Sequence, residues 1–276
     1  MSQKPGSKQF GSQVIMILTS FSILFPLYFM VVNAFKTRDQ YLLDPLGLPV
    51  PFTLQNFIDA FAGKDFLSWF ANSVILSVTT VIITGVIALL AAYAFAKMKF
   101  AGRDPLFRMI VPLMSVSPVA MLIPLFKFVS AIGLVNTLGS VILIYCGLCL
   151  PLTVYMMRNF LLSVPDSLLE AARIDGCSRF GILLHIITPL SVPSIITSGL
   201  VNLVWAWNEL LIALVFLQKE SLRTLIVGTT IFKSRYTLNV PVIMAGLVVV
   251  TIPMIIVYIF GQKRLVQGLM AGAVKG

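Results

Sequence analysis

The sequence contains few charged or chemically reactive residues. Of its 276 residues, 11% are Asp, Glu, Lys or Arg, one is histidine and three are cysteine. Cys146 and Cys149 form a C-x-x-C pair, but their apolar surroundings hold no histidine, which favours small buried side chains over a metal or redox site. The G-x-x-x-x-G-K-[ST] and H-E-x-x-H motifs and acid–base pairs at catalytic spacing are also missing. These absences argue against catalysis, including ATP hydrolysis, by this chain.

Apolar residues dominate instead, at 58% of the sequence, and the mean hydropathy is +0.99. Six stretches contain no Asp, Glu, Lys or Arg, and each has the roughly 18–20 residues that a helix needs to cross hydrocarbon. They are residues 9–35, 66–96, 109–126, 128–157, 180–208 and 236–262. A β-barrel would show alternating strands of about ten residues, which do not occur here. We therefore predict an all-α membrane protein with six transmembrane helices.

The six helices divide the chain into spans, loops and tails. The predicted order is a tail (1–12), a first helix (13–35), an outer loop (36–68), helices at 69–95, 109–127 and 138–157, a charged segment (158–189), a helix (190–214), an outer loop (217–239), a last helix (240–262) and a tail (264–276). Residues 69–263, from the second to the last predicted helix, form the transmembrane core. The first stretch could be a signal peptide, but its apolar part is long and residues 33–36 make a poor cleavage site, so we interpret it as a retained helix.

The basic residues indicate an orientation. With the N-terminus in the cytoplasm, twelve Lys and Arg residues fall inside and eight outside, in agreement with the positive-inside rule. Both termini are then cytoplasmic. The net charge of +10 is spread over the loops that flank the membrane, so we expect lipid rather than nucleic acid as a partner.

Polar residues within the predicted helices have two alternative roles. A stripe at helical spacing in the second helix is either one wall of a polar path or a surface for close helix packing. It consists of Ser73, Ser77, Thr80 and Thr84. Glu209, with Asn208, belongs either to the substrate path or gate or to a structural contact at the membrane interface. Ser115 and Ser117 lie beside helix-bending prolines and are further path candidates.

The charged segment (158–189) has the signals of two short helices. Ser163, Pro165 and Asp166 suit a helix N-terminus. Gly176 suits a left-handed C-terminal residue, and Ser178 can cap a second helix that Pro189 ends before the next span.

Several motifs of the chain resemble those of one family. The charged segment resembles the EAA motif of ATP-binding-cassette (ABC) importer permeases, through Glu170-Ala171-Ala172, Asp175-Gly176 and Pro189. Four further stretches are similar to the smaller permease subunit of maltose-type sugar importers. They are residues 93–103, 133–137, 207–209 and 268–276. The chain departs from the family pattern at Leu169, Cys177 and Leu183, which bears on the ATPase that fits.

The resemblance implies a type I ABC importer permease fold with a cytoplasmic pair of coupling helices, in a bacterial or archaeal cytoplasmic membrane. The implied partners are a larger, homologous second permease, two copies of a cytoplasmic ABC ATPase and an extracytoplasmic sugar-binding protein. No cofactor is expected on this chain, because ATP and Mg would be bound by the ATPase. The implied cargo is a di- or oligosaccharide.

The resemblance also assigns residues. Those expected to couple to the ATPase are Glu170, Ala171, Ala172, Asp175, Gly176, Ser178, His185 and Pro189, and those of the ATPase-contacting tail are Gly272, Lys275 and Gly276. For His185 a docking contact is favoured over a proton relay. Alternatives for the whole chain are a permease of the same superfamily for glycerol-3-phosphate, a phosphodiester or another solute, and an ion-driven secondary transporter. The last class usually shows paired intramembrane charges or inverted repeats.

Overall fold

A computed structural model describes residues 7–61, 66–235 and 239–273, with side chains described for 11–61, 66–230 and 239–262. The described residues form helices and loops without β-strands, as predicted for an all-α protein. They belong to two compact units, Met1–Lys64 with Gly228–Pro253 and Asp65–Val227 with Met254–Gly276. We describe each unit by itself.

Five helices are long and apolar enough to cross a membrane individually. Their spanning parts are Gly11–Ala34, Phe66–Lys97, Leu138–Leu162, Arg179–Asn208 and Val240–Gln262. The sixth predicted span, 109–127, is a pair of helices, α5 (Arg103–Leu113) and α6 (Pro118–Ala131), which meet at a bend of 105°. Pro118 is the reason for the break, because a residue that precedes proline avoids the helical region and Ser117 is extended, with ψ of 126°.

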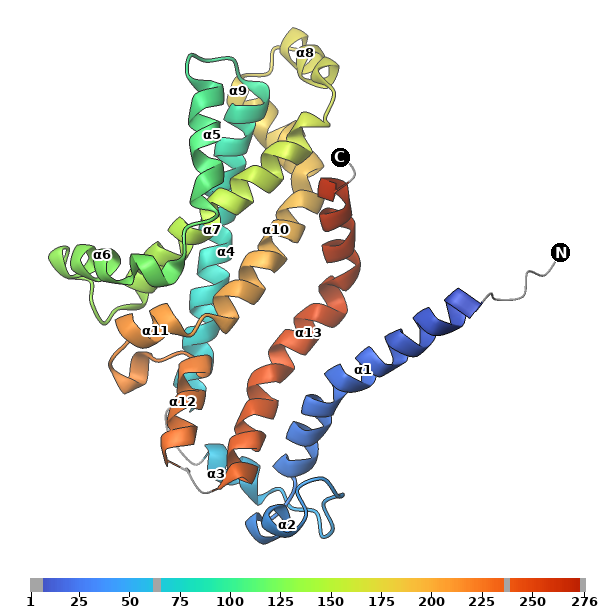
Figure 1. The fold of residues 1–276 in the computed structure, drawn as a ribbon. Helices are drawn as coiled ribbons and strands as arrows, with labels where there is room; N and C mark the ends of the chain where they lie inside the picture. Colours follow the sequence, from blue (N-terminus) through green and yellow to red (C-terminus); the bar gives the residue numbers. More distant parts are fainter. Residues whose placement is uncertain (1–6, 62–65, 236–238, 274–276) are drawn as a thin grey trace. The chain divides into compact units, whose positions relative to one another are not determined.

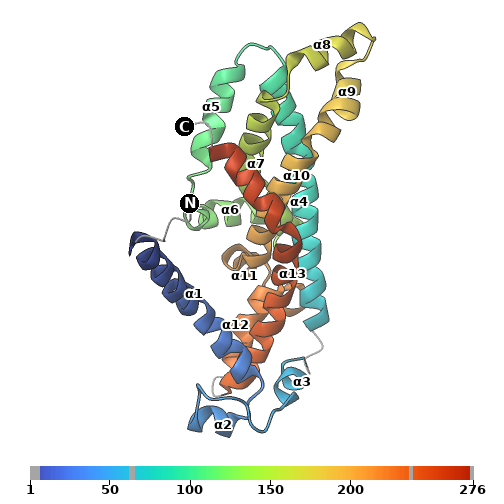
Figure 2. The same cartoon turned by 90° about the vertical axis from the view of Figure 1, so that its right-hand side faces the viewer.

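The second unit is built around α4 (Phe66–Lys97), α7 (Leu138–Leu162) and α10 (Thr188–Asn208), which pack along one another (Figures 1 and 2). The small polar stripe of α4 lies inside this packing: Ser77, Thr80 and Thr84 are fully buried. Small side chains allow helix backbones to approach closely in a membrane. Burial of the stripe favours the packing alternative over the wall of a polar path.

The last outer loop of the second unit is hydrogen-bonded to α4. Trp69 Nε1 donates to the Glu220 carbonyl at 2.8 Å, and Asn72 Nδ2 donates to the carbonyls of Ser221 and Arg223. Two short helices, α11 (Leu211–Phe216) and the 3₁₀ turn η2 (Glu220–Leu222), lie here and α12 (Leu225–Arg235) follows. The predicted span 190–214 is therefore corrected, because its helix ends at Asn208.

The first unit contains α1 (Ser7–Ala34), α2 (Arg38–Leu43), α3 (Gln55–Phe61) and the beginning of α13 (Val240–Ala273). Its outer loop is held by buried polar groups. Lys36, 1% exposed, donates through Nζ to the Asp44 carbonyl at 2.6 Å, and Asn56 Nδ2 donates to the carbonyls of Ala34 and Lys36.

The predicted tails 1–12 and 264–276 are partly helical in the structure. Helix α1 begins at Ser7 and α13 continues to Ala273. The continuation has a sequence reason, because residues 263–273 contain no proline that would end the helix.

Candidate functional site

The charged segment (158–189) forms a hairpin of short helices, α8 (Asp166–Ile174) and α9 (Arg179–Ile182), at the end of α7 (Figures 1 and 2). The predicted N-cap at Ser163 is wrong. Its hydroxyl donates to the Phe160 carbonyl at 2.6 Å and so closes α7, while Pro165 precedes the first residue of α8. The hydroxyl is occupied because α7 runs five residues beyond its predicted end at 157.

The turn between α8 and α9 is a Schellman motif. Gly176 has a φ of 81°, its N–H donates to the Arg173 carbonyl at 3.1 Å, and the N–H of Cys177 donates to the Ala172 carbonyl at 2.9 Å. The hydroxyl of Ser178 then accepts from the Gly181 N–H at 3.1 Å and caps α9. Most polar backbone groups of this turn are satisfied locally, so its geometry is defined by the sequence.

Pro189 does not end the second helix, contrary to the sequence prediction. Helix α9 leads through a π-helical turn, η1 (Leu183–Ile187), directly into α10, and Arg179–Asn208 is one continuous span. The N–H of Thr188 donates to the Leu183 carbonyl five residues earlier, and so does the Thr188 hydroxyl. The wider turn accommodates a proline that can neither donate a hydrogen bond nor tolerate the carbonyl four residues before it.

One face of the hairpin packs on the bundle. Leu169 and Ala172 of α8 are buried together with Ile182, Leu183 and Ile187, in a cluster that also contains residues of α4, α5 and α7. Leu169 was noted in the sequence only as a departure from the family pattern. Its spacing of three from Ala172 could have identified it as part of the buried face.

The opposite face of the hairpin is exposed and mixes charges with large apolar side chains. Glu170 and Arg173 are exposed, and Ile174 and Phe180 are 86% and 62% exposed. Within the described residues, Glu170 makes no hydrogen bond or ion pair to its own chain. An exposed charged and apolar surface on a rigid turn suits docking of another protein.

A polar contact that the sequence did not predict joins this hairpin to α4. Lys97 Nζ donates to Asp166 Oδ1 and to the Val164 carbonyl, both at 2.6 Å, and its side chain is 4% exposed. The hydrogen bond from Lys97 lowers the pKa of Asp166 below its ordinary value. The contact therefore stabilises the folded state at pH values above the ordinary carboxyl pKa. This stabilisation is lost as the pH falls through the lowered pKa of the folded state.

Glu209 lies in the break between α10 and α11, and its side chain bonds to α7 and to the first turn of α11. Its carboxylate accepts from the Tyr145 hydroxyl at 2.8 Å and from the N–H groups of Ile212 and Ala213 at 2.9–3.1 Å. These contacts occupy the carboxylate at a helix N-terminus, which favours the structural alternative for Glu209. Asn208 is exposed and donates to the Val204 carbonyl at 2.8 Å.

The remaining candidates lie apart from these residues. Ser115 and Ser117 are exposed in the break between α5 and α6. His185 is exposed in the π-helical turn, with Nδ1 3.0 Å from the Gly181 carbonyl oxygen. Gly272 lies near the end of α13, while Lys275 and Gly276 are outside the described residues. In the described part of the chain, no three His, Cys, Asp or Glu side chains are grouped to hold a metal ion.

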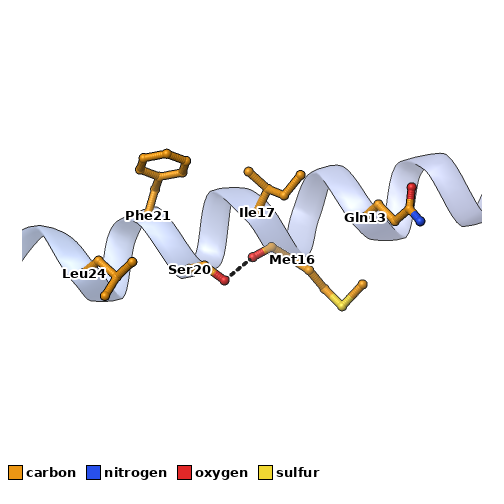
Figure 3. Close-up of a pocket in the computed structure, with 6 residues that line it drawn as sticks. All are labelled: Gln13, Met16, Ile17, Ser20, Phe21 and Leu24. Carbon is orange, nitrogen blue, oxygen red and sulfur yellow. Dashed lines mark hydrogen bonds between the residues drawn. The ribbon is translucent and has the colours of Figure 1, made fainter.

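A shallow hollow of about 400 Å³ runs along α1 (Figure 3). Its lining comes from successive turns of this single helix, from Gln13 to Leu24, and the Ser20 hydroxyl donates to the Met16 carbonyl at 2.8 Å. The surface is almost entirely apolar and presents no convergent polar groups. We therefore do not assign it as a solute site.

The long apolar helices place the chain among membrane-spanning proteins, and the family match makes it a permease, which is a translocation subunit. Residues 84–270 match the family described as "Binding-protein-dependent transport system inner membrane component". The chain belongs to this family of ABC importer permeases, and it is an integral membrane protein.

Known proteins that are similar cover almost the whole chain. A putative ABC transporter permease protein of Caldicellulosiruptor sp. is 38% identical over 91% of this chain and 91% of its own length. The sulfoquinovosyl glycerol transport system permease protein SmoH of Agrobacterium fabrum is 35% identical over 92% of this chain and 89% of its own. In the crystal structure of a bacterial importer of alginate, one chain shares this fold with a TM-score of 0.83 and 23% identity, over 95% of this chain and 99% of that one.

Proposed function

We propose that this chain is the sugar-translocating permease of a binding-protein-dependent importer and carries a di- or oligosaccharide across the cytoplasmic membrane by alternating access. The observation that carries the proposal is the hairpin of α8 and α9, exposed on one face and packed on the spanning helices with the other. The family name supports dependence on a binding protein, and the relative named for the transport of sulfoquinovosyl glycerol supports the class of cargo.

The proposed mechanism assigns the energy source to another chain. An ABC ATPase docks on the exposed face around Glu170, in the cytoplasm, and changes shape as it binds and hydrolyses ATP with Mg. The resulting displacement of the hairpin is passed to the spanning helices through its buried face, at Leu169 and Ala172. A second, homologous permease completes the path, and the binding protein delivers sugar at the outer loops. Each ligand drives the cycle through its different affinity for the inward- and outward-open states.

Two membrane-protein alternatives remain outcomes of the test. A glycerol phosphate or phosphodiester cargo would leave the mechanism intact and change only the solute. An ion-driven secondary transporter would need no ATPase, and the exposed face of α8 would then have no docking function.

The test is uptake of labelled oligosaccharides into proteoliposomes that contain this chain, its partner permease and ATPase, with the binding protein outside. We expect uptake that requires enclosed ATP, the binding protein and both permeases. Uptake by this chain alone, driven by an ion gradient, would refute the proposal. The panel should include maltose-type sugars, sulfoquinovosyl glycerol and glycerol phosphodiesters, so that the cargo class is decided in the same experiment.

A further inference from the structure

Both helices of the α8–α9 hairpin are held to α4 at their first residues. At the beginning of α8, Lys97 Nζ donates to Asp166 Oδ1 and to the Val164 carbonyl at 2.6 Å. At the beginning of α9, the Tyr93 hydroxyl donates to the Arg179 carbonyl at 3.3 Å. Tyr93 and Lys97 are four residues apart and therefore lie on one face of the last turns of α4.

The Lys97 contact adds a directional restraint to the apolar packing of the hairpin. The Lys97 side chain is 4% exposed while that of Asp166 is 76% exposed, so the ammonium group depends on these two oxygens in place of water. A buried ammonium that loses its partners is costly, and its hydrogen bonds are directional whereas the hydrophobic effect is not. The contact therefore fixes the register of the Val164–Asp166 turn against α4.

Helix α4 also reaches the outer loops at its other end. Near its beginning, Trp69 and Asn72 donate to the carbonyls of Glu220, Ser221 and Arg223, and the Ser73 hydroxyl accepts from the Leu225 N–H at 2.8 Å. Its 32 residues correspond to about 48 Å of helix. One rigid element thus contacts the hairpin at one end and the outer loop of residues 217–225 at the other.

We propose that α4 is the strut that transmits displacement of the hairpin to the outer loop, and that Lys97 is the positioning residue that makes the hairpin and α4 move as one body. The proposal deepens the proposed function and rests on it. Lys97 touches no solute in this account; it acts through the position of α8. We expect loss of the Lys97 side chain to weaken the coupling of ATP hydrolysis to sugar transport, while ATP hydrolysis itself continues.

The first test compares Lys97→Met with Lys99→Met in the reconstituted importer. Both remove one positive charge at the end of α4 or just after it, but Lys99 is exposed and, within the described residues, has no hydrogen bond or ion pair. For Lys97→Met we expect an intact complex, basal ATP hydrolysis within about twofold, and about tenfold less sugar imported per ATP, the order expected when a charge-assisted hydrogen bond is lost. Lys99→Met should behave as the unaltered protein.

A variant of Asp166, which accepts the hydrogen bond from Lys97, adds a further comparison. Asp166→Asn should reduce the sugar imported per ATP less than Lys97→Met, because the bond to the Val164 carbonyl remains. The double variant should be no worse than Lys97→Met alone. An unchanged ratio of sugar to ATP in Lys97→Met would overturn the proposal, and so would failure of that variant to assemble, which would assign the contact to assembly instead.

A second measurement does not depend on transport. Spin labels at Leu90→Cys on α4 and Ile174→Cys on α8, both exposed positions, report the distance between the two elements in a background without the native cysteines. We expect one narrow distance distribution, which broadens in Lys97→Met and not in Lys99→Met. An unchanged distance distribution in Lys97→Met would refute the proposal that Lys97 fixes the hairpin to α4, even if transport depends on ATP as proposed. Absence of ATP-driven uptake by the unaltered complex would refute the proposed function alone.

Discussion

At the scale of single residues, Glu170 is the clearest candidate for contact with a partner protein. It is exposed and makes no ion pair within the described residues, so replacing it costs the fold little. We expect Glu170→Lys to assemble in the membrane and to lose most uptake, because the reversed charge lies on the face that is proposed to dock the ATPase. Co-purification of the ATPase measures the docking directly, and Glu170→Asp should retain it. Full transport by Glu170→Lys would show that this face does not dock.

For Glu209, the structure favours a structural contact over a role in the substrate path. Because its carboxylate caps α11 and accepts from Tyr145, we expect Glu209→Gln, which keeps one acceptor oxygen, to cause a moderate loss of uptake. Glu209→Ala should lower the unfolding free energy by about 1–3 kcal/mol. Thermal unfolding of the purified protein measures this difference.

Tyr145→Phe serves as the matched variant for Glu209. It removes one hydrogen bond to the carboxylate and leaves the two backbone contacts of the cap. A role in the solute path would be established instead if Glu209→Gln abolished solute-stimulated ATP hydrolysis while Tyr145→Phe left both stability and hydrolysis unchanged.

At the scale of elements, the turn at Gly176 joins the two helices of the docking hairpin. Its φ of 81° is in the left-handed region, which costs most other residues about 1–2 kcal/mol. Gly176→Ala should therefore destabilise the hairpin by about this amount, while Gly176→Asn should be tolerated better, because asparagine adopts this conformation more readily. Hydrogen exchange of the α8 amides measures the effect.

A helix-interior glycine provides the control for Gly176. Gly147 in α7 has a negative φ, and a Cβ placed there meets no atom within 4 Å. Gly147→Ala should be neutral or stabilising. Equal protection of α8 in Gly176→Ala and Gly147→Ala would contradict the assigned role of the turn.

Elements were predictable from the sequence where the signal is local. Length and apolarity identify the spans, and the glycine identifies the turn after α8. The breaks depend on tertiary contacts. Pro189 can stay within a continuous helix because η1 widens the turn before it. Helix α10 ends at Asn208, where the next residue, Glu209, is extended and its carboxylate binds Tyr145 of α7 and the first turn of α11. The Lys97 contact joins residues 69 positions apart, so no short pattern indicates it.

At the scale of the whole molecule, the chain is one part of an importer. It has an exposed hairpin, a bundle of spanning helices and ordered outer loops, and the signatures of ATP hydrolysis are missing from its sequence. The proposed function therefore assigns the energy for motion of the bundle to another chain. We therefore expect transport to depend on a separate ATPase.

The most direct measurement of this dependence is sugar uptake into proteoliposomes with ATP enclosed, comparing the complete complex with one that carries an ATPase unable to hydrolyse ATP. The account predicts uptake that requires hydrolysis, persists when ion gradients are dissipated and is strongly reduced by Glu170→Lys. Uptake that continues at full rate with the inactive ATPase, or that stops when the ion gradient alone is removed, would contradict it.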